Sequence, residues 1–529
     1  MRVMKRMTLF ILSLTTFIML GLSGCGDDIT NNPITEVTTP SSPENVQATP
    51  ANRQIAIQWT PVAGATYYNI YWATEPGVDA TCRRISTNQF PYLHIGLSDT
   101  TTYYYRISSI NSAGESALST EISTRARARF SDMIKSLSAS DGAASDFFGN
   151  TVSISGDYAI IGAHGDDDGG KTDSGAAYIF HRTGPDSWDS GTKITASDAM
   201  AGDYFGYSVS ICGDYAIVGA QYVDVGGSMS SGAAYIFHRT GPNAWDDGIK
   251  IIAPDAQTAD QFGCSVSISG DYAIVGALGD RGGDGDLLVN AGAAYIYHRT
   301  GANTWDDGAK IIASDAQGSD MFGYSVSIDG NYVIVGSYWE DDGGSNAGAA
   351  YIFNRTGTNA WDAGTKIVAA DAHTNDWFGA SVSIHGDYAV VGVEGYDGGD
   401  GDPLANAGAA YIYHRTGINT WDDGTKIIAP DAQAFDYFGR SVSIYGDNII
   451  VGAYQEDNGT GDPILDCGSA YIFHRTGTNI WDHGTKIVAE DAETADEFGY
   501  SVSISGEYVI VGAHLEDSGG SSAGAAYIF

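Results

Sequence analysis

The chain has 529 residues, more than one compact core usually supports, so several domains or one large repeat fold are expected. Glycine accounts for 69 residues, and short apolar runs alternate with turn residues, which indicates an all-β protein. The 65 acidic residues outnumber the 26 basic ones, for a net charge of −39, and this argues against nucleic acid as a partner because a phosphate backbone needs basic contacts.

Residues 1–24 form an export signal: basic residues, then an apolar run, then a small-residue step before a cysteine. That step, Leu22-Ser23-Gly24-Cys25, resembles the lipobox of bacterial lipoproteins. The resemblance implies cleavage before Cys25 and attachment of a diacylglyceryl group to its sulfur, which would anchor the chain to a membrane. The alternative is an ordinary secretory signal followed by an incidental cysteine.

A polar stretch rich in Thr and Pro, residues 25–42, follows and suits a tether. Under the lipoprotein resemblance, Gly26 directly after the cysteine suggests the outer membrane or cell surface, although Asp27 and Asp28 complicate that assignment. The four later cysteines are scattered singly, so the sequence predicts neither a disulfide framework nor a cysteine metal site.

From Pro43 the chain alternates apolar and polar residues with a period of two, which predicts strands. Residues 43–126 resemble a fibronectin type III domain through a core-type tryptophan, Trp59, and through Leu97 placed six residues before Tyr103, as in the tyrosine corner of that family. The resemblance implies a β-sandwich, and we expect it to be a spacer.

The remainder, residues 127–529, is one unit repeated seven times. Each unit starts with a Phe-Gly pair, and successive pairs are separated by 57, 57, 60, 56, 60 and 60 residues. The pairs begin at Phe148, Phe205, Phe262, Phe322, Phe378, Phe438 and Phe498.

Four strands are expected in each unit. In the second unit they are residues 208–211, 215–218, 234–237 and 250–253. One such sheet cannot bury both faces alone, so neighbouring sheets must stack, and closure into a ring removes the exposed ends. The sequence therefore predicts a seven-bladed β-propeller.

The two ends of the repeat array complement each other. The seventh unit stops at Phe529, directly after its third strand, while residues 130–140 contain a strand-like run at 134–137 and a turn like those that precede the Phe-Gly pairs. We expect this early segment to supply the fourth strand of the last blade and to close the ring.

Phe-Gly followed about 14 positions later by Gly-Ala resembles the FG-GAP repeats of integrin α-subunit heads and of many bacterial surface proteins. The resemblance implies a propeller that mediates adhesion or ligand binding. Two features depart from it. The proline of the motif is absent, as in Gly162-Ala163-His164, and turns such as Gly156-Asp157 leave no room for the calcium loop of integrins.

Residues that recur from unit to unit are interpreted as structural, because a catalytic site needs one asymmetric cluster. The His-Arg steps and tryptophans belong to this class, although Asn354 replaces the histidine before Arg355. The His-Arg steps begin at His181, His238, His298, His414 and His474, and the tryptophans are Trp188, Trp245, Trp305, Trp361, Trp421 and Trp481.

The loops after the second strands are different, since carboxylates and glycines gather there without a fixed pattern. Several oxygen ligands in a flexible loop suit calcium, and the alternative is a solvated acidic loop. We expect these loops to share one face of the disc with the connections between blades. The candidate metal ligands are Asp166, Asp168, Asp284, Asp286, Asp400 and Asp402.

No nucleophile elbow, zinc motif, phosphate-binding loop or paired-cysteine motif is found, so we expect a protein that is not an enzyme and has no certain cofactor besides possible calcium. The predicted function is surface adhesion or binding of an extracellular protein or glycan. The alternative is a carbohydrate-binding or carbohydrate-active, lyase-like propeller, which a single deep cluster of His, Tyr, Arg and carboxylate would favour. Loop aromatics that suit sugar stacking are Tyr338, Trp339, Tyr396 and Tyr454.

Overall fold

The computed structural model describes residues 37–51, 54–94, 97, 101–125, 130, 133–184, 186–282, 288–397, 404–457 and 464–529. The predicted signal segment and Cys25 lie outside these residues. Over the described residues the regular structure is β, apart from one 3-10 turn, η1 (Asp168–Gly170). None of the helical structure described there is long and apolar enough to cross a membrane.

The N-terminal part folds into two antiparallel sheets that share one core. Trp59 and Tyr105 are buried in it, together with Leu97 and Tyr103 of the predicted tyrosine corner. The fibronectin type III assignment itself stays a prediction. One sheet contains β1 (Gln47–Ala51), β2 (Gln54–Gln58) and β5 (Tyr92–His94). The other contains β4 (Arg83–Thr87), β3 (Tyr67–Ala73), β6 (Thr102–Asn111), β7 (Gly114–Glu115) and β8 (Ile122–Arg125).

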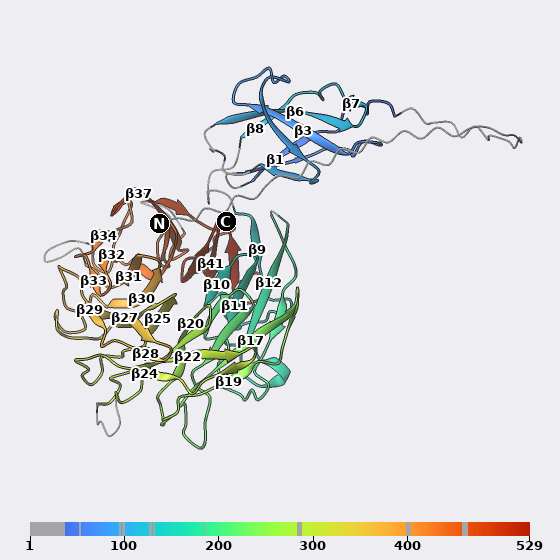
Figure 1. The fold of residues 1–529 in the computed structure, drawn as a ribbon. Helices are drawn as coiled ribbons and strands as arrows, with labels where there is room; N and C mark the ends of the chain where they lie inside the picture. Colours follow the sequence, from blue (N-terminus) through green and yellow to red (C-terminus); the bar gives the residue numbers. More distant parts are fainter. Residues whose placement is uncertain are drawn as a thin grey trace, which may run out of the picture.

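Seven sheets follow, arranged around a common axis, and the predicted seven-bladed β-propeller is confirmed (Figure 1). The innermost strands are β10 (Val152–Ser155), β15 (Ser208–Cys212), β20 (Phe262–Ser269), β25 (Ser325–Asp329), β30 (Phe378–His385), β35 (Phe438–Tyr445) and β40 (Ser501–Ser505). The second strands are β11 (Tyr158–Ala163), β16 (Tyr215–Ala220), β21 (Tyr272–Ala277), β26 (Tyr332–Ser337), β31 (Tyr388–Val393), β36 (Asn448–Ala453) and β41 (Tyr508–Ala513).

The outer half of each blade is built from a long third strand and a short fourth one. The third strands are β12 (Ala176–Gly184), β17 (Ala233–Gly241), β22 (Ala293–Gly301), β27 (Ala349–Gly357), β32 (Ala409–Gly417), β37 (Ser469–Gly477) and β42 (Ala525–Ile528). The fourth strands are β14 (Thr192–Ile194), β19 (Ile249–Ile251), β24 (Ala309–Ile311), β29 (Thr365–Ile367), β34 (Thr425–Ile427), β39 (Thr485–Ile487) and, in the last blade, β9 (Lys135–Leu137).

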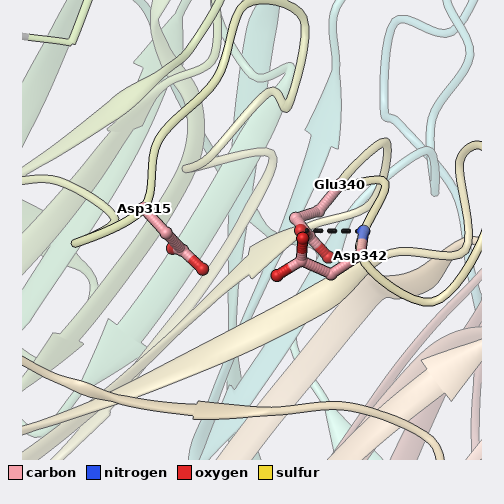
Figure 2. Close-up of side chains that lie close together, drawn as sticks. All are labelled: Asp315, Glu340 and Asp342. Carbon is pink, nitrogen blue, oxygen red and sulfur yellow. Dashed lines mark hydrogen bonds between the residues drawn. The ribbon is translucent and has the colours of Figure 1, made fainter.

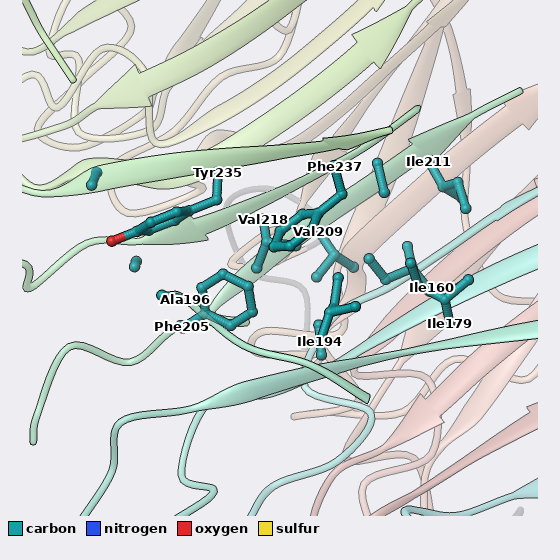
Figure 3. Packing of buried hydrophobic residues seen from close by; sticks show 14 of the residues in the cluster. Ile160, Ile179, Ile194, Ala196, Phe205, Val209, Ile211, Val218, Tyr235 and Phe237 are labelled. Atoms are coloured by element: carbon teal, nitrogen blue, oxygen red, sulfur yellow. The ribbon is translucent and has the colours of Figure 1, made fainter. Parts of the chain in front are cut away.

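Each blade buries its two faces against its neighbours. Figure 3 shows one such interface, where Ile160 and Ile179 of the first blade pack against Phe205, Val209 and Phe237 of the second. The second strands are buried along their whole length, except for the partly buried Tyr332 at the start of β26, which explains their apolar runs. The hydrophobic core of the propeller is therefore a ring of layers between blades.

The last blade takes its outer strand from the start of the array. β9 pairs antiparallel with β42, with Ser136 opposite Tyr527, so the seventh sheet has the order β40-β41-β42-β9. Segments of the chain about 400 residues apart thus belong to one sheet, which closes the ring.

The third strands extend further than the sequence indicated. In the second blade, β17 continues through the His-Arg-Thr-Gly segment and pairs with β18 (Ala244–Trp245), whereas a connection was expected there. Arg239 from this extension lies 4.7 Å from the ring centroid of Tyr158 in the preceding blade, and Trp245 packs edge-on to the same ring. The recurring arginine and tryptophan therefore hold adjacent blades together. The other short strands of this kind are β13 (Ser187–Trp188), β23 (Thr304–Trp305), β28 (Ala360–Trp361), β33 (Thr420–Trp421) and β38 (Ile480–Trp481).

Candidate functional site in the central channel

The axis of the ring is a channel lined by the seven innermost strands, with a cavity of about 250 Å³. In every blade the residue that follows Phe-Gly points into it, and these seven positions are named the inner ring. Unlike the Phe-Gly pair beside them, they vary among the blades, although three of the seven are tyrosines. The inner ring consists of Asn150, Tyr207, Cys264, Tyr324, Ala380, Arg440 and Tyr500.

A second variable position lies beside the first. The first and second strands are antiparallel, so the end of the second strand lies next to the beginning of the first. The residue directly after the second strand therefore reaches the same end of the channel, and these seven positions are named the second ring. The second ring consists of His164, Gln221, Leu278, Tyr338, Glu394, Tyr454 and His514.

Arg440 is the centre of the polar cluster in this channel. Its Nη2 donates to the hydroxyl of Tyr500 at 2.7 Å, and its Nη1 lies 3.5 Å from the hydroxyl of Tyr324. The carboxylate of Glu394 lies 3.4 Å from Nη1, so the guanidinium is charge-balanced. Because 22% of the Arg440 side chain remains exposed, the cluster is open to a ligand in the channel.

Two titratable residues extend the cluster toward the mouth of the channel. The ring of His514 lies 4.0 Å from the ring of Tyr500, and its Nε2 lies 3.7 Å from a carboxylate oxygen of Glu497. Burial lowers the pKa of His514 to about 3 and raises the pKa of Glu497 to about 7. A neutral imidazole and a carboxyl group that titrates near neutral pH therefore lie side by side.

An aromatic wall covers the neighbouring part of the mouth. His164 stacks on Phe147 with 5.2 Å between ring centroids, and Tyr204 and Tyr207 approach it edge-on. Burial lowers the pKa of His164 to about 4, so it is neutral at physiological pH. The Nδ1 atoms of His164 and His514 are buried without a hydrogen-bond partner. Such groups are uncommon and are often completed by water or a ligand.

The residue immediately before each Phe-Gly pair has a left-handed backbone. Phe147 and Glu497, with φ of 56° and 58°, belong to this set, and large side chains occupy the position in all seven blades. A left-handed backbone is unfavourable for residues other than glycine, and its recurrence in every blade makes it a feature of the scaffold that places these side chains at the mouth. The set is Phe147, Tyr204, Gln261, Met321, Trp377, Tyr437 and Glu497.

The tyrosine hydroxyls of the channel are hydrogen-bond donors at neutral pH. Burial raises the pKa of Tyr207, Tyr338 and Tyr454 above the usual value of 10, and the carboxylate of Glu394 adds to the rise at Tyr338 and Tyr454. Tyr338 and Tyr454 are two of the loop aromatics predicted to stack on sugars. Both belong to the second ring, where Tyr338 packs on Tyr324 and Tyr454 on Tyr500.

The predicted metal ligands divide into two groups. Asp166 is buried, and both of its carboxylate oxygens lie 2.9 Å from Nζ of Lys193, while the hydroxyl of Tyr178 donates to it at 2.8 Å. Asp168 lies 3.4 Å from the same ammonium group. Calcium in this loop stays a prediction. The remaining candidates, Asp284, Asp286, Asp400 and Asp402, lie outside the described residues.

The same lysine and carboxylate arrangement recurs around the disc. In the fourth blade, Nζ of Lys366 lies 2.8 Å from Asp315, 2.8 Å from Glu340 and 2.5 Å from Asp342. Figure 2 shows these three carboxyl groups, whose oxygens all lie within 4.8 Å of one another. The geometry would suit a metal ion, but the ammonium group of Lys366 lies between the oxygens. We interpret this cluster as an ion-pair network.

The acid-rich loops and the connections between blades meet at one face, as expected. The backbone N–H groups of Tyr204 and Phe205, which lead into the second blade, donate to the carbonyls of Asp173 and Ser174 in the loop of the first blade. The aromatic and arginine-containing mouth of the channel opens on this face. Apart from Tyr338 and Tyr454, its residues were missed in the sequence, where the signal was available as variable positions beside the invariant Phe-Gly pairs.

Comparison with known proteins agrees with the repeat architecture. The family model described as FG-GAP repeat matches residues 133–180, 188–237, 245–297, 305–353, 361–413, 421–473 and 481–529. Among solved structures, the crystal structure of FN3tt is 25% identical, covering 17% of this chain and 97% of its own, with a TM-score of 0.15. A mutant of FN3tt is 26% identical with the same coverage and TM-score. No curated protein matches. With seven matched segments that together span more than half of its length, the chain belongs to the FG-GAP repeat family.

Proposed function

We propose that this protein is a lipid-anchored cell-surface binding protein, not an enzyme, and that its propeller holds a carbohydrate ligand at the mouth of the central channel. The observation that carries the proposal is the asymmetric cluster of Arg440, Glu394, Tyr324 and Tyr500 at positions where the repeat is otherwise free to vary. FG-GAP propellers are ligand-binding or adhesion-type domains, which is consistent with a binding role.

The chemistry of the mouth suits a sugar. Aromatic rings offer flat apolar faces, and tyrosine, arginine and glutamate side chains offer donors and acceptors that fix hydroxyl groups. Because Glu394 balances the charge of Arg440, the site favours a neutral or singly charged saccharide over a highly charged ligand. The anchor rests on the lipobox-like step at Cys25, and adhesion through a glycan would follow from an anchored propeller whose channel faces outward.

A glycan array followed by calorimetry on the purified full-length chain tests the proposal. Arg440→Ala is expected to weaken binding at least about tenfold, because it removes a charged hydrogen-bond donor. The blade tolerates this side chain, since Ala380 occupies the same ring position in the fifth blade. Arg281→Ala, which removes an exposed arginine from a loop outside the channel, is the control. Unchanged glycan binding by the Arg440 variant would refute the site.

A catalytic, carbohydrate-active function is the second candidate, favoured by the neighbouring Glu497 and His514. A carboxyl group with a pKa of about 7 beside a neutral imidazole is suited to proton transfer. Incubation of bound glycans with the protein, followed by analysis for shortened or unsaturated products, distinguishes the two functions. Turnover that is lost in Glu497→Gln would establish the enzyme, and intact glycans would establish the binding protein.

A further inference from the structure

The seventh blade differs from the other six at one chemically decisive position. In six blades, a lysine on the fourth strand lies directly opposite a buried tyrosine on the third, as Lys366 lies opposite Tyr351. In the seventh blade the strand is β9, and Ser136 lies opposite Tyr527. The lysines of the other blades are Lys193, Lys250, Lys310, Lys366, Lys426 and Lys486.

The carboxylates that accompany the lysine remain in the seventh blade. Its loop matches that of the fourth blade: the N–H of Ser518 donates to Glu516 at 2.9 Å, as the N–H of Asp342 donates to Glu340 at 3.0 Å. Asp491 stands at the position of Asp315 in the repeat, and Glu516 is buried as Glu340 is. In the part of the chain that the structure describes, no ion pair involves Asp491 or Glu516.

The buried hydroxyl of Tyr527 is a second, independent sign that a group is missing. Tyr527 is 0% exposed, and its hydroxyl lies beside the carboxylate of Asp491 without a hydrogen bond of normal length. In the fourth blade the equivalent hydroxyl of Tyr351 donates to Asp315 at 2.8 Å. Burial raises the pKa of Tyr527, and the nearby carboxylates of Asp491 and Glu516 add to the rise.

Lys135 cannot take the place of the missing lysine. It lies one residue from Ser136 on β9, opposite Ile528, and successive side chains of a strand point to opposite faces. It is exposed. The carboxylate cluster of the seventh blade therefore lacks the ammonium group that balances the other six.

We propose that the seventh blade binds a hard divalent cation of the calcium type between Asp491, Glu516 and the hydroxyl of Tyr527, at the place where a lysine ammonium group lies in the other blades. All available side-chain ligands are oxygens, which calcium prefers, and two carboxylates balance its charge. The short side chain of Ser136 leaves room for the ion and its water. The ion would join the connection before β40, the loop after β41 and β42, which is the strand that pairs with β9.

The test uses the full-length chain stripped of metal with EDTA. Calorimetry with calcium chloride is expected to show one site per chain, and millimolar calcium is expected to raise the Tm by about 2–5 °C. Ser136→Lys restores the lysine of the other blades, so this variant should lose the calcium response and should melt above the wild type in EDTA. Glu516→Gln should weaken calcium binding at least about tenfold, since a charged ligand is lost.

Ser187→Lys is the control, because it adds the same charge to an exposed position on β13, at the opposite face of the disc. It should keep the calcium response of the wild type. A wild type without a calcium response would overturn the proposal. So would a Ser136→Lys variant that binds calcium as the wild type does, because the ion would then lie elsewhere.

Discussion

The backbone N–H of Ile154 in the first blade donates a hydrogen bond of 3.1 Å to Oγ of Ser503 in the last. The same bond links every pair of adjacent blades, so the Val-Ser-Ile segments of the inner strands form a closed ring of hydrogen bonds. The other bonds run from Ile211 to Ser153, Ile268 to Ser210, Ile328 to Ser267, Ile384 to Ser327, Ile444 to Ser383 and Ile504 to Ser443.

At the outer edge of the last blade, β9 pairs with β42. Deletion of residues 130–140 removes β9 and leaves β42 with an unpaired edge, which invites association with other chains. We expect a lower Tm and soluble aggregates in size-exclusion chromatography. A deletion of equal length in the predicted tether, residues 26–36, is the control. A monomeric deletion variant with an unaltered Tm would argue against closure by this segment.

Glycine is required at positions of the repeat where the backbones of two blades approach closely. A Cβ atom at Gly175 would lie 2.0 Å from the carbonyl oxygen of Phe205 in the next blade, and φ at Gly175 is 81°. Gly175→Ala must therefore separate two blades, and we expect it to destabilise the fold by more than about 3 kcal/mol. At Gly156 a Cβ atom meets nothing within 4 Å, and φ is 58°. Gly156→Asn should cost less than about 1 kcal/mol in denaturant unfolding.

The repeated parts of the fold could be predicted from the sequence, because they follow from its local periodicity. Seven Phe-Gly units gave the number of blades, and the confirmed propeller follows from their need to stack. The extended third strand was missed because the His-Arg-Thr-Gly segment contains turn-forming residues. In the second blade, this segment forms a strand whose Arg239 and neighbouring Trp245 pack against Tyr158 of the preceding blade. That contact depends on tertiary structure.

The channel site was missed for a different physical reason. Residues that recur from blade to blade form the scaffold, whereas the site is built from positions that vary. Arg440 and Tyr324 are 116 residues apart, and only the closed ring brings their side chains together. The position directly after each Phe-Gly pair was visible as variable, but which of these residues meet across the axis follows from the geometry of the seven blades.

Replacement of the predicted lipid attachment site tests the anchor. If Cys25 carries the diacylglyceryl group, Cys25→Ser should give an exported protein that no longer partitions with membranes, since a lipid chain supplies the apolar anchor. The measurement is fractionation of cells expressing either form, followed by immunoblotting. Equal membrane recovery of the two forms would contradict the lipoprotein prediction.

Buried aspartates before the Phe-Gly pairs should make stability depend on pH. Burial raises the pKa of Asp436 to about 7 and of Asp260 and Asp496 to about 6. A raised pKa means that the folded state prefers the protonated form, so stability increases as pH falls from about 7 toward 4. The exposed Asp315 has a lowered pKa, because hydrogen bonds from Lys366 and Tyr351 outweigh its partial desolvation, so its contribution is lost below about pH 4.

We therefore expect the Tm to be higher at pH 5 than at pH 8 and to fall again below pH 4. Differential scanning calorimetry across this range measures the curve. Asp436→Asn keeps an acceptor for the N–H of Gln433 but removes the titrating group, and it should flatten the rise between pH 8 and pH 5. A Tm that is constant from pH 8 to pH 5 in the wild type would contradict the shifted aspartate pKa values.

The lysine of the fourth blade offers the reverse of the change in the seventh. Lys366→Ser gives the fourth blade the serine that the seventh has, and it leaves the buried carboxylate of Glu340 beside Asp315 and Asp342 without a cation. Loss of one partner from a buried ion pair typically costs about 3–5 kcal/mol, so the Tm in EDTA should fall. The double variant Lys366→Ser with Glu340→Gln should recover part of this loss, since the uncompensated charge is gone.

Because three carboxylate oxygens already lie within 4.8 Å of one another, calcium should restore the Tm of the single variant but not that of the double variant. Calcium that stabilises both variants equally would show that the carboxylate of Glu340 is not a ligand.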